Sequence, residues 1–185
     1  MSNVITGRVA AELIAHEGLV REAYRDSVGV WTWSIGITSQ SGHDVHPRYV
    51  DNPQPLKRCF EVFEWLLRTR YKPAVDAAFK GVALSEAQFG AALSFHYNTG
   101  GIGRATWVKD WVAGEADAAR AAFMNWSKPA EIIPRREKER DLFFDEVWSN
   151  AGTAVEYPVK KPSYLPDIVK GKSVDISGVL KDLFG

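Results

Sequence analysis

One short stretch, residues 12–38, constrains the fold of this chain more than any other. Apolar residues recur at helical spacing between about residues 3 and 16, and Gly18 stands where such a helix would end. Residues 26–29 begin with Asp and end with Gly, which is typical of a turn, and residues 30–35 are aromatic and β-branched, which favours a strand. The stretch therefore predicts a helix followed by a short β reversal.

Two carboxyl residues and a threonine lie within or next to this reversal. Glu17 ends the predicted helix, Asp26 begins the turn nine residues later, and Thr32 lies on the returning strand. Such a reversal can bring two carboxyls to facing walls of one cleft, where Thr32 could hold a water. Glycoside hydrolysis uses two carboxyls in different environments, one protonated and one ionised. The spacing alone leaves open the alternative that Glu17 and Asp26 are unrelated surface charges.

The residues around these acids resemble the signature of the phage-type lysozymes (endolysins, muramidases) of tailed phages. That signature runs E-G, then Y-x-D, then G-x-x-T-I-G-x-G-H-T. The chain departs from it in the Thr-Ile-Gly run, which is Thr32-Trp33-Ser34 here, and at the His, which is Ile37, and these departures bear on the shape of the cleft. The residues that match are Glu17, Gly18, Tyr24, Asp26, Gly29, Thr32, Gly36 and Thr38.

The resemblance implies a muramidase that hydrolyses the β-1,4 bond between N-acetylmuramic acid and N-acetylglucosamine in bacterial peptidoglycan. Glu17 would be the general acid, and Asp26 with Thr32 would position and activate a water. This is the inverting arrangement, for which the two carboxyls stand roughly 6.5 to 9.5 Å apart. The partner would be a glycan strand, with no cofactor and no metal. The alternatives are a lytic transglycosylase, which uses a lone Glu, and a non-catalytic peptidoglycan-binding or virion structural module.

A second segment carries the same resemblance. Residues 85–88 form a capping box, and the apolar run that follows ends at paired glycines after Asn98. The family has Q-F-x-A-L-x-S-F-x-F-N-x-G here, which implies that Tyr97 and Asn98 contact the sugar chain. Without that match, Tyr97 would be a core residue and Asn98 a helix cap.

A third segment, residues 134–148, is predicted to be a helix that is charged outside and apolar inside. It contains the family's R-R-x-x-E-x-x-L pattern, which makes Arg136 the candidate to pair with Glu17 and orient it. The alternative is that Arg135 and Arg136 are two solvated charges at the start of a helix.

These segments predict an α+β, lysozyme-like fold. A small β-containing lobe, about residues 12–54, is joined by a long helix over residues 55–71 to a larger helical lobe. The helical lobe covers about residues 72–149 and includes the first helix, so the catalytic domain spans residues 1–149. Residues 150–185 form a Pro-containing extension with a short amphipathic helix near its end. We expect this extension to dock on the body, and wall binding is its alternative role.

Composition excludes several other classes of protein. The 23 Lys and Arg residues balance 23 Asp and Glu residues, so no overall field attracts nucleic acid. A single cysteine, Cys59, excludes an internal disulfide and suits a reducing compartment. His43, Asp44 and His46 fall in a polar segment that we interpret as an exposed loop, not a metal site.

The N-terminus shows no signal peptide or membrane anchor. We expect a monomer without membrane insertion, held in the host cytoplasm until a holin releases it to the periplasm and cell wall.

Overall fold

The structure, a computed structural model, describes residues 3–150 and 152–185. The chain forms two compact units. The helical unit comprises Arg68–Ser149 and the N-terminal residues up to Ile5, and the β-containing unit comprises Thr6–Leu67 and Asn150–Gly185. In the part of the chain that the structure describes, no helix is long and apolar enough to cross a membrane.

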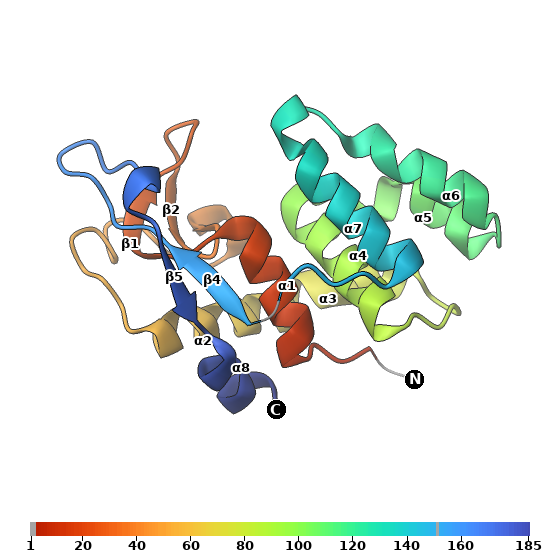
Figure 1. Cartoon of the computed structure of the whole chain (residues 1–185), viewed down its shortest axis with the longest axis horizontal. Coiled ribbons are helices and arrows are strands. Elements are labelled where there is room, and N and C mark those ends of the chain that lie inside the picture. The colour runs from red at the N-terminus through yellow and green to blue at the C-terminus, as the bar shows by residue number, and fades with distance from the viewer. Residues whose placement is uncertain (1–2, 151) are drawn as a thin grey trace. The chain divides into compact units, whose positions relative to one another are not determined.

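The β-containing unit opens with the predicted helix and reversal (Figure 1). Helix α1 (Gly7–Glu17) starts where the Thr6 hydroxyl accepts the Val9 N–H, and it ends at Gly18, whose φ of 71° favours glycine. Three antiparallel strands follow in the order β1-β2-β3. They are β1 (Val20–Arg25), β2 (Trp31–Ser34) and β3 (Ile37–Thr38). Their core side chains, such as Ala23 and Trp33, are fully buried.

The predicted long helix over residues 55–71 consists of two pieces and is followed by a short helix. Helix α2 (Leu56–Leu66) buries its apolar stripe, the segment Leu67–Tyr71 is π-helical, and α3 (Lys72–Ala78) follows. The wider π turns accommodate one more residue per hydrogen-bonded ring than an α-helix does. The periodicity predicted the helix but not this change of winding.

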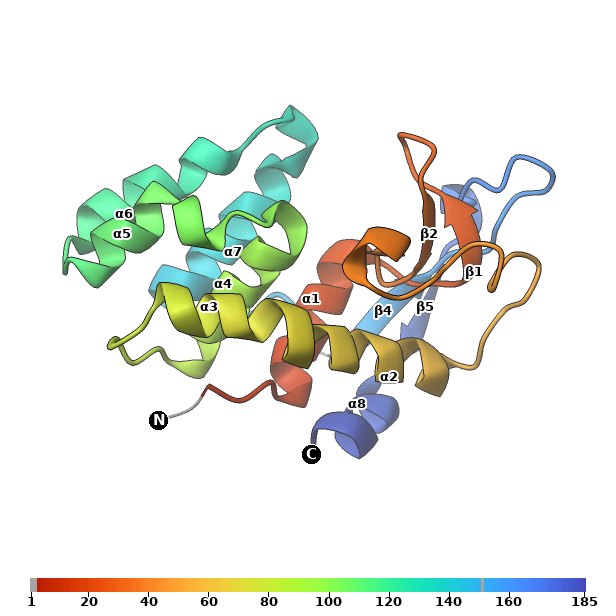
Figure 2. The same cartoon turned by 180° about the vertical axis from the view of Figure 1, so that it is seen from behind.

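The helical unit packs around a cluster of aromatic side chains. Helix α4 (Glu86–Thr99) lies along α7 (Ile133–Asp145), and α5 (Thr106–Val112) lies along α6 (Ala116–Phe123), as both views show (Figure 2). The predicted capping box is present, with the Ser85 hydroxyl and the Gln88 side chain each accepting the other residue's backbone N–H. The fully buried aromatic residues at the centre are Phe89, Phe95, Trp107, Phe123 and Phe143.

The C-terminal extension, residues 150–185, is more ordered than its sequence predicts. It forms an antiparallel hairpin of β4 (Thr153–Glu156) and β5 (Lys172–Asp175), followed by α8 (Ser177–Phe184). Both β4 and α8 contact α1. The first helix, which the sequence analysis grouped with the helical lobe, therefore belongs to the β-containing unit, because its buried face meets elements of the extension.

Candidate active site

Three polar side chains form a row across one face of the small sheet. Tyr24 on β1 lies directly opposite Thr32 on β2, and Thr32 lies directly opposite Thr38 on β3. Residues in direct register across antiparallel strands project to the same face, so these three side chains are neighbours. Thr32 is only 3% exposed. The row places a buried hydroxyl next to a phenol at the start of the Asp26 turn.

The carboxylate of Asp26 is oriented by its own turn. Its Oδ1 accepts the backbone N–H of Val28 at 3.0 Å and that of Val30 at 2.8 Å. The backbone N–H of Gly29 also donates to the Asp26 carbonyl at 3.0 Å, which closes the turn. Within the described part of the chain, no hydrogen bond to Oδ2 occurs, so that oxygen retains its capacity to accept a proton.

The hydroxyl of Thr32 is oriented by the same residue. Thr32 Oγ1 donates to the Val30 carbonyl at 3.1 Å. Because this bond uses the only hydroxyl proton, Oγ1 can only accept hydrogen bonds from other groups. Asp26 and Thr32 are therefore both fixed by Val30 and both able to accept hydrogen bonds.

Tyr24 links this turn to Glu17. The pKa of Tyr24 is raised strongly, first by burial and then by the negative charges of Glu17 and of Asp26. Both carboxylates therefore interact electrostatically with the phenol. Glu17 is the last residue of α1 and is half-buried. The structure places Glu17, Asp26 and Thr32 in the β-containing unit, with Thr32 directly opposite Tyr24 and both acids raising the pKa of its phenol.

Tyr24 was not among the predicted site residues. The signal that could have identified it is strand alternation, since Tyr24 and Thr32 are placed symmetrically about the turn that begins at Asp26.

Two of the residues that depart from the family signature, Ser34 and Ile37, are buried in the small sheet. Ser34 stands where the signature has Gly, and its φ is 59°, in the left-handed region that favours glycine. Its buried hydroxyl donates to the Cys59 carbonyl at 3.2 Å. Ile37 is buried and adjacent in β3 to Thr38, so it projects to the face opposite Thr32. Neither side chain belongs to the Tyr24–Thr32–Thr38 row.

The two histidines of the segment that we interpreted as an exposed loop stack on tryptophans. The His43 ring lies parallel to Trp33 and shares a hydrogen bond of 2.7 Å with the Tyr49 hydroxyl, and burial lowers the pKa of His43. His46 is exposed and stacks on Trp31. Among the described residues, no group of three or more His, Cys, Asp or Glu side chains could hold a metal ion.

The remaining predicted site residues lie in the helical unit. Arg136 is 1% exposed, donates to the Asn98 side-chain oxygen at 2.7 Å and to the Trp126 carbonyl at 3.1 Å, and forms an ion pair with Glu139. Burial is the main cause that lowers the pKa of Arg136. Tyr97 packs against Tyr71 with ring centroids 4.7 Å apart. The alternative that Arg136 is solvated is therefore wrong, and its pairing with Glu17 stays a prediction.

Glu139 is the centre of a buried polar network that the sequence analysis did not predict. It is 0% exposed and accepts hydrogen bonds from Ser94, Arg135 and Arg136. The helical spacings of three and four residues in the R-R-x-x-E pattern place both arginines beside it. Asn98 and Arg136 also line a surface pocket of about 390 Å³ together with Trp126 and Lys128.

Comparison with known proteins gives a consistent result. The family model described as phage lysozyme matches residues 14–139. The endolysin of Bacillus phage B103 is 29% identical over 172 residues, which cover 83% of this chain and 62% of that protein. The chain thus spans about three fifths of the length of this relative.

Solved structures show the same fold. An endolysin of the Escherichia coli O157:H7 phage FAHEc1 superposes with a TM-score of 0.63 at 24% identity, covering 78% of this chain and 94% of that one. A lysozyme of phage P22 gives a TM-score of 0.62 at 24% identity, covering 77% and 99% of the two chains. The predicted α+β, lysozyme-like fold is therefore confirmed.

Proposed function

Because the chain belongs to the phage lysozyme family, we propose that it is an endolysin that hydrolyses the β-1,4 bond between N-acetylmuramic acid and N-acetylglucosamine in bacterial peptidoglycan. Its substrate is a glycan strand of the host wall, and it acts as a monomer in host lysis. It stays in the host cytoplasm until a holin releases it to the wall.

The observation that carries this proposal is the shared attachment of Asp26 and Thr32 to Val30. A water that attacks a sugar carbon must direct a lone pair at that carbon while its protons point to acceptors. Asp26 Oδ2 and Thr32 Oγ1 are acceptors on neighbouring, rigidly held groups. Together they support a site for such a water, with the Asp26 carboxylate taking the proton as general base.

Glu17 supplies the other half of the reaction. Its carboxyl proton passes to the glycosidic oxygen as the bond from the anomeric carbon to that oxygen breaks, while the water oxygen bonds to the same carbon from the opposite face. The product has inverted configuration. The Tyr24 phenol, whose pKa is raised by burial and by both acids, stays protonated and adds no third charge. In the helical unit, Tyr97 and Asn98 are proposed to contact the sugar chain, and Arg136 to orient Glu17.

Replacing Glu17 by Gln tests the assignment. We expect Glu17→Gln to abolish clearing of a peptidoglycan suspension, because an amide cannot donate the required proton. Glu61→Gln, which changes a partly exposed carboxyl on α2, is the matched control and should clear normally. Unchanged clearing by Glu17→Gln would refute the proposal.

The products distinguish the alternatives. An inverting hydrolase releases reducing ends that are initially α-anomers, whereas a lytic transglycosylase releases anhydro-muramoyl ends that are lighter by one water. The presence of Asp26 and Thr32 favours hydrolysis, since a transglycosylase needs no activated water. A non-catalytic module would bind the suspension and release no fragments.

A further inference from the structure

The outer edge of strand β1 is covered along its whole length. Alternate residues of an edge strand present their backbone groups outward, where they need partners. In the middle of β1, the Arg21 carbonyl accepts the Gln54 N–H and the Ala23 N–H donates to the Tyr49 carbonyl, both at 2.8 Å. The two ends of the edge are covered by the C-terminal extension instead.

At the first end, the extension bonds to the chain just after Glu17. The Leu19 N–H donates to the Val155 carbonyl at 2.9 Å, and the Tyr157 N–H donates to the Leu19 carbonyl at 2.9 Å. Leu19 is fully buried, so neither of its backbone groups has water as an alternative partner. The extension therefore fixes the main chain two residues beyond Glu17.

The ring of Tyr157 lies between two glycines beside this contact. A Cβ atom on Gly18 would come within 2.9 Å of one edge of the ring, and a Cβ atom on Gly171 within 2.6 Å of the other. Both distances are shorter than any normal carbon–carbon contact, so each position requires a residue without a side chain. Tyr157 is thus packed directly against the residue that follows Glu17.

At the second end, the extension bonds to the chain just before Asp26. The Arg25 N–H donates to the Tyr164 carbonyl at 2.7 Å. The Tyr164 ring meets Trp31 edge-on with centroids 5.2 Å apart, and its hydroxyl donates to Asp51 at 2.8 Å. The same extension thus holds the main chain next to each of the two proposed catalytic acids.

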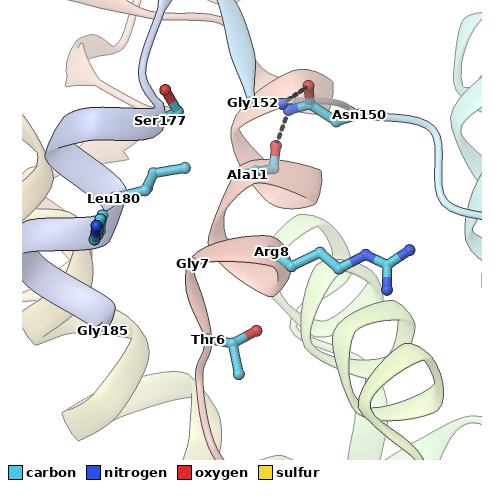
Figure 3. A pocket seen from close by; sticks show the side chains of 10 residues that line it. Thr6, Gly7, Arg8, Ala11, Asn150, Gly152, Ser177, Leu180 and Gly185 are labelled. Carbon is cyan, nitrogen blue, oxygen red and sulfur yellow. Dashed lines mark hydrogen bonds between the residues drawn. The ribbon is translucent and has the colours of Figure 1, made fainter.

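The extension is also anchored along α1 itself. The Asn150 side chain donates to the Ala11 carbonyl and accepts the Gly152 N–H at 3.0 Å (Figure 3). Leu180 of α8 lies 3.6 Å from the position of a Cβ on Gly7. A pocket of about 530 Å³ separates these two anchors. The extension therefore meets α1 near its start, in its middle and at its end.

We propose that the C-terminal extension is a positioning element for catalysis and that Tyr157 is its principal positioning residue. The inference rests on the proposed function of Glu17 and Asp26. The extension fixes the backbone on which each carboxyl is mounted, and hence the separation of general acid and general base. A displacement of about 1 Å in such a group can cost about 10²-fold in rate.

The test compares Tyr157→Ala with Tyr157→Phe in the whole chain, with soluble glycan-strand fragments of peptidoglycan as substrate. Tyr157→Ala removes the ring between Gly18 and Gly171, whereas Tyr157→Phe removes only its hydroxyl. We expect Tyr157→Ala to lower kcat about 10-fold or more and to leave KM within about twofold. Tyr157→Phe should keep the kcat of the unmodified chain.

Leu180→Ala is the matched control for general loosening of the extension. It removes a buried side chain of α8 that lies near the start of α1 and not near its end. Assayed below its unfolding midpoint, Leu180→Ala should show a lowered midpoint and an unchanged kcat.

Two results would overturn the inference: an unchanged kcat in folded Tyr157→Ala, or equal losses of kcat in Tyr157→Ala and Leu180→Ala. Either would assign the extension a purely structural role, provided that Glu17→Gln is inactive in the same assay. An active Glu17→Gln variant would instead refute the proposed function and, with it, the premise of this inference.

Discussion

Asp26 and Thr32 are held by one residue, because Val30 donates its N–H to the Asp26 carboxylate and accepts the Thr32 hydroxyl proton at its carbonyl. The two hydrogen bonds, 2.8 Å and 3.1 Å long, fix the relative orientation of a carboxylate and a hydroxyl. The orientation of the Asp26 carboxylate relative to the Thr32 hydroxyl is therefore set within a turn of a few residues.

Replacing Thr32 by Val tests the role of the hydroxyl. Val keeps the shape of the side chain, so the sheet should persist, and the lost hydrogen bond to Val30 should cost about 1 kcal/mol of unfolding free energy. We expect kcat for glycan hydrolysis to fall about 10²-fold or more, because the water loses one acceptor. Thr32→Ser, which retains the hydroxyl, should recover most of the activity. A fully active Thr32→Val would exclude Thr32 from the reaction.

Replacing Asp26 by Asn separates the turn from the chemistry. The amide oxygen of Asn can still accept the N–H groups of Val28 and Val30, but an amide is no base. We expect Asp26→Asn to unfold at nearly the same denaturant concentration as the unmodified chain and to lose about 10²- to 10⁴-fold in kcat. Asp26→Ala should lose activity and also stability. Equal stability of Asp26→Asn and Asp26→Ala would contradict the role of the carboxylate in the turn.

Tyr24 should make stability sensitive to alkaline pH. The pKa of Tyr24 in the folded chain is raised above its ordinary value of about 10 by burial and by Glu17 and Asp26. Above about pH 10, the unfolded chain releases the phenol proton while the folded chain retains it. The free energy of unfolding therefore falls as pH rises toward the pKa of Tyr24 in the folded chain. The contribution of the protonated Tyr24 to the free energy of unfolding is fully present below about pH 10. Urea unfolding of the unmodified chain and of Tyr24→Phe, measured on both sides of that pH, should show a smaller loss in the variant.

The buried ion pair of α7 should dominate the stability of the helical unit. Glu139→Ala leaves the 1% exposed Arg136 without its carboxylate, which should cost about 3–5 kcal/mol in denaturant unfolding. Asp145→Ala, which breaks the exposed pair with Arg120, is the control and should change stability little. Similar losses of unfolding free energy in the two variants would show that burial does not determine how much these ion pairs contribute to stability.

Local sequence signals predicted the elements whose stabilising contacts are themselves local. The reversal after Glu17 and the capping box at Ser85 follow from residues at most a few positions apart, and both are present in the structure. Helix α8 also follows from its own apolar spacing. The family resemblance added the roles proposed for Glu17, Asp26 and Thr32, which composition and spacing could not supply.

The pairing of distant segments could not be predicted in the same way. Strands β4 and β5 are separated by residues 157–171, which contain prolines and no short turn signal. The residue that pairs with the other side of β4, Leu19, lies more than a hundred residues away along the chain. Arg136 was interpreted through one proposed partner, whereas its three partners come from three elements: Asn98 from α4, Trp126 from the turn Met124–Trp126 and Glu139 from α7 itself.

Gly18 joins the proposed active site to the extension and gives a double-mutant test. Gly18→Ala should destabilise the chain by about 1–3 kcal/mol, because its φ of 71° with ψ near 180° is a conformation that non-glycine residues rarely adopt. A further loss should come from the contact of the new methyl group with the Tyr157 ring. In a Tyr157→Ala background the second loss should vanish, so the two substitutions should be non-additive by about 0.5 kcal/mol or more. Unfolding free energies of the four proteins give this coupling directly, and strict additivity would mean that the Tyr157 ring does not press on the residue after Glu17.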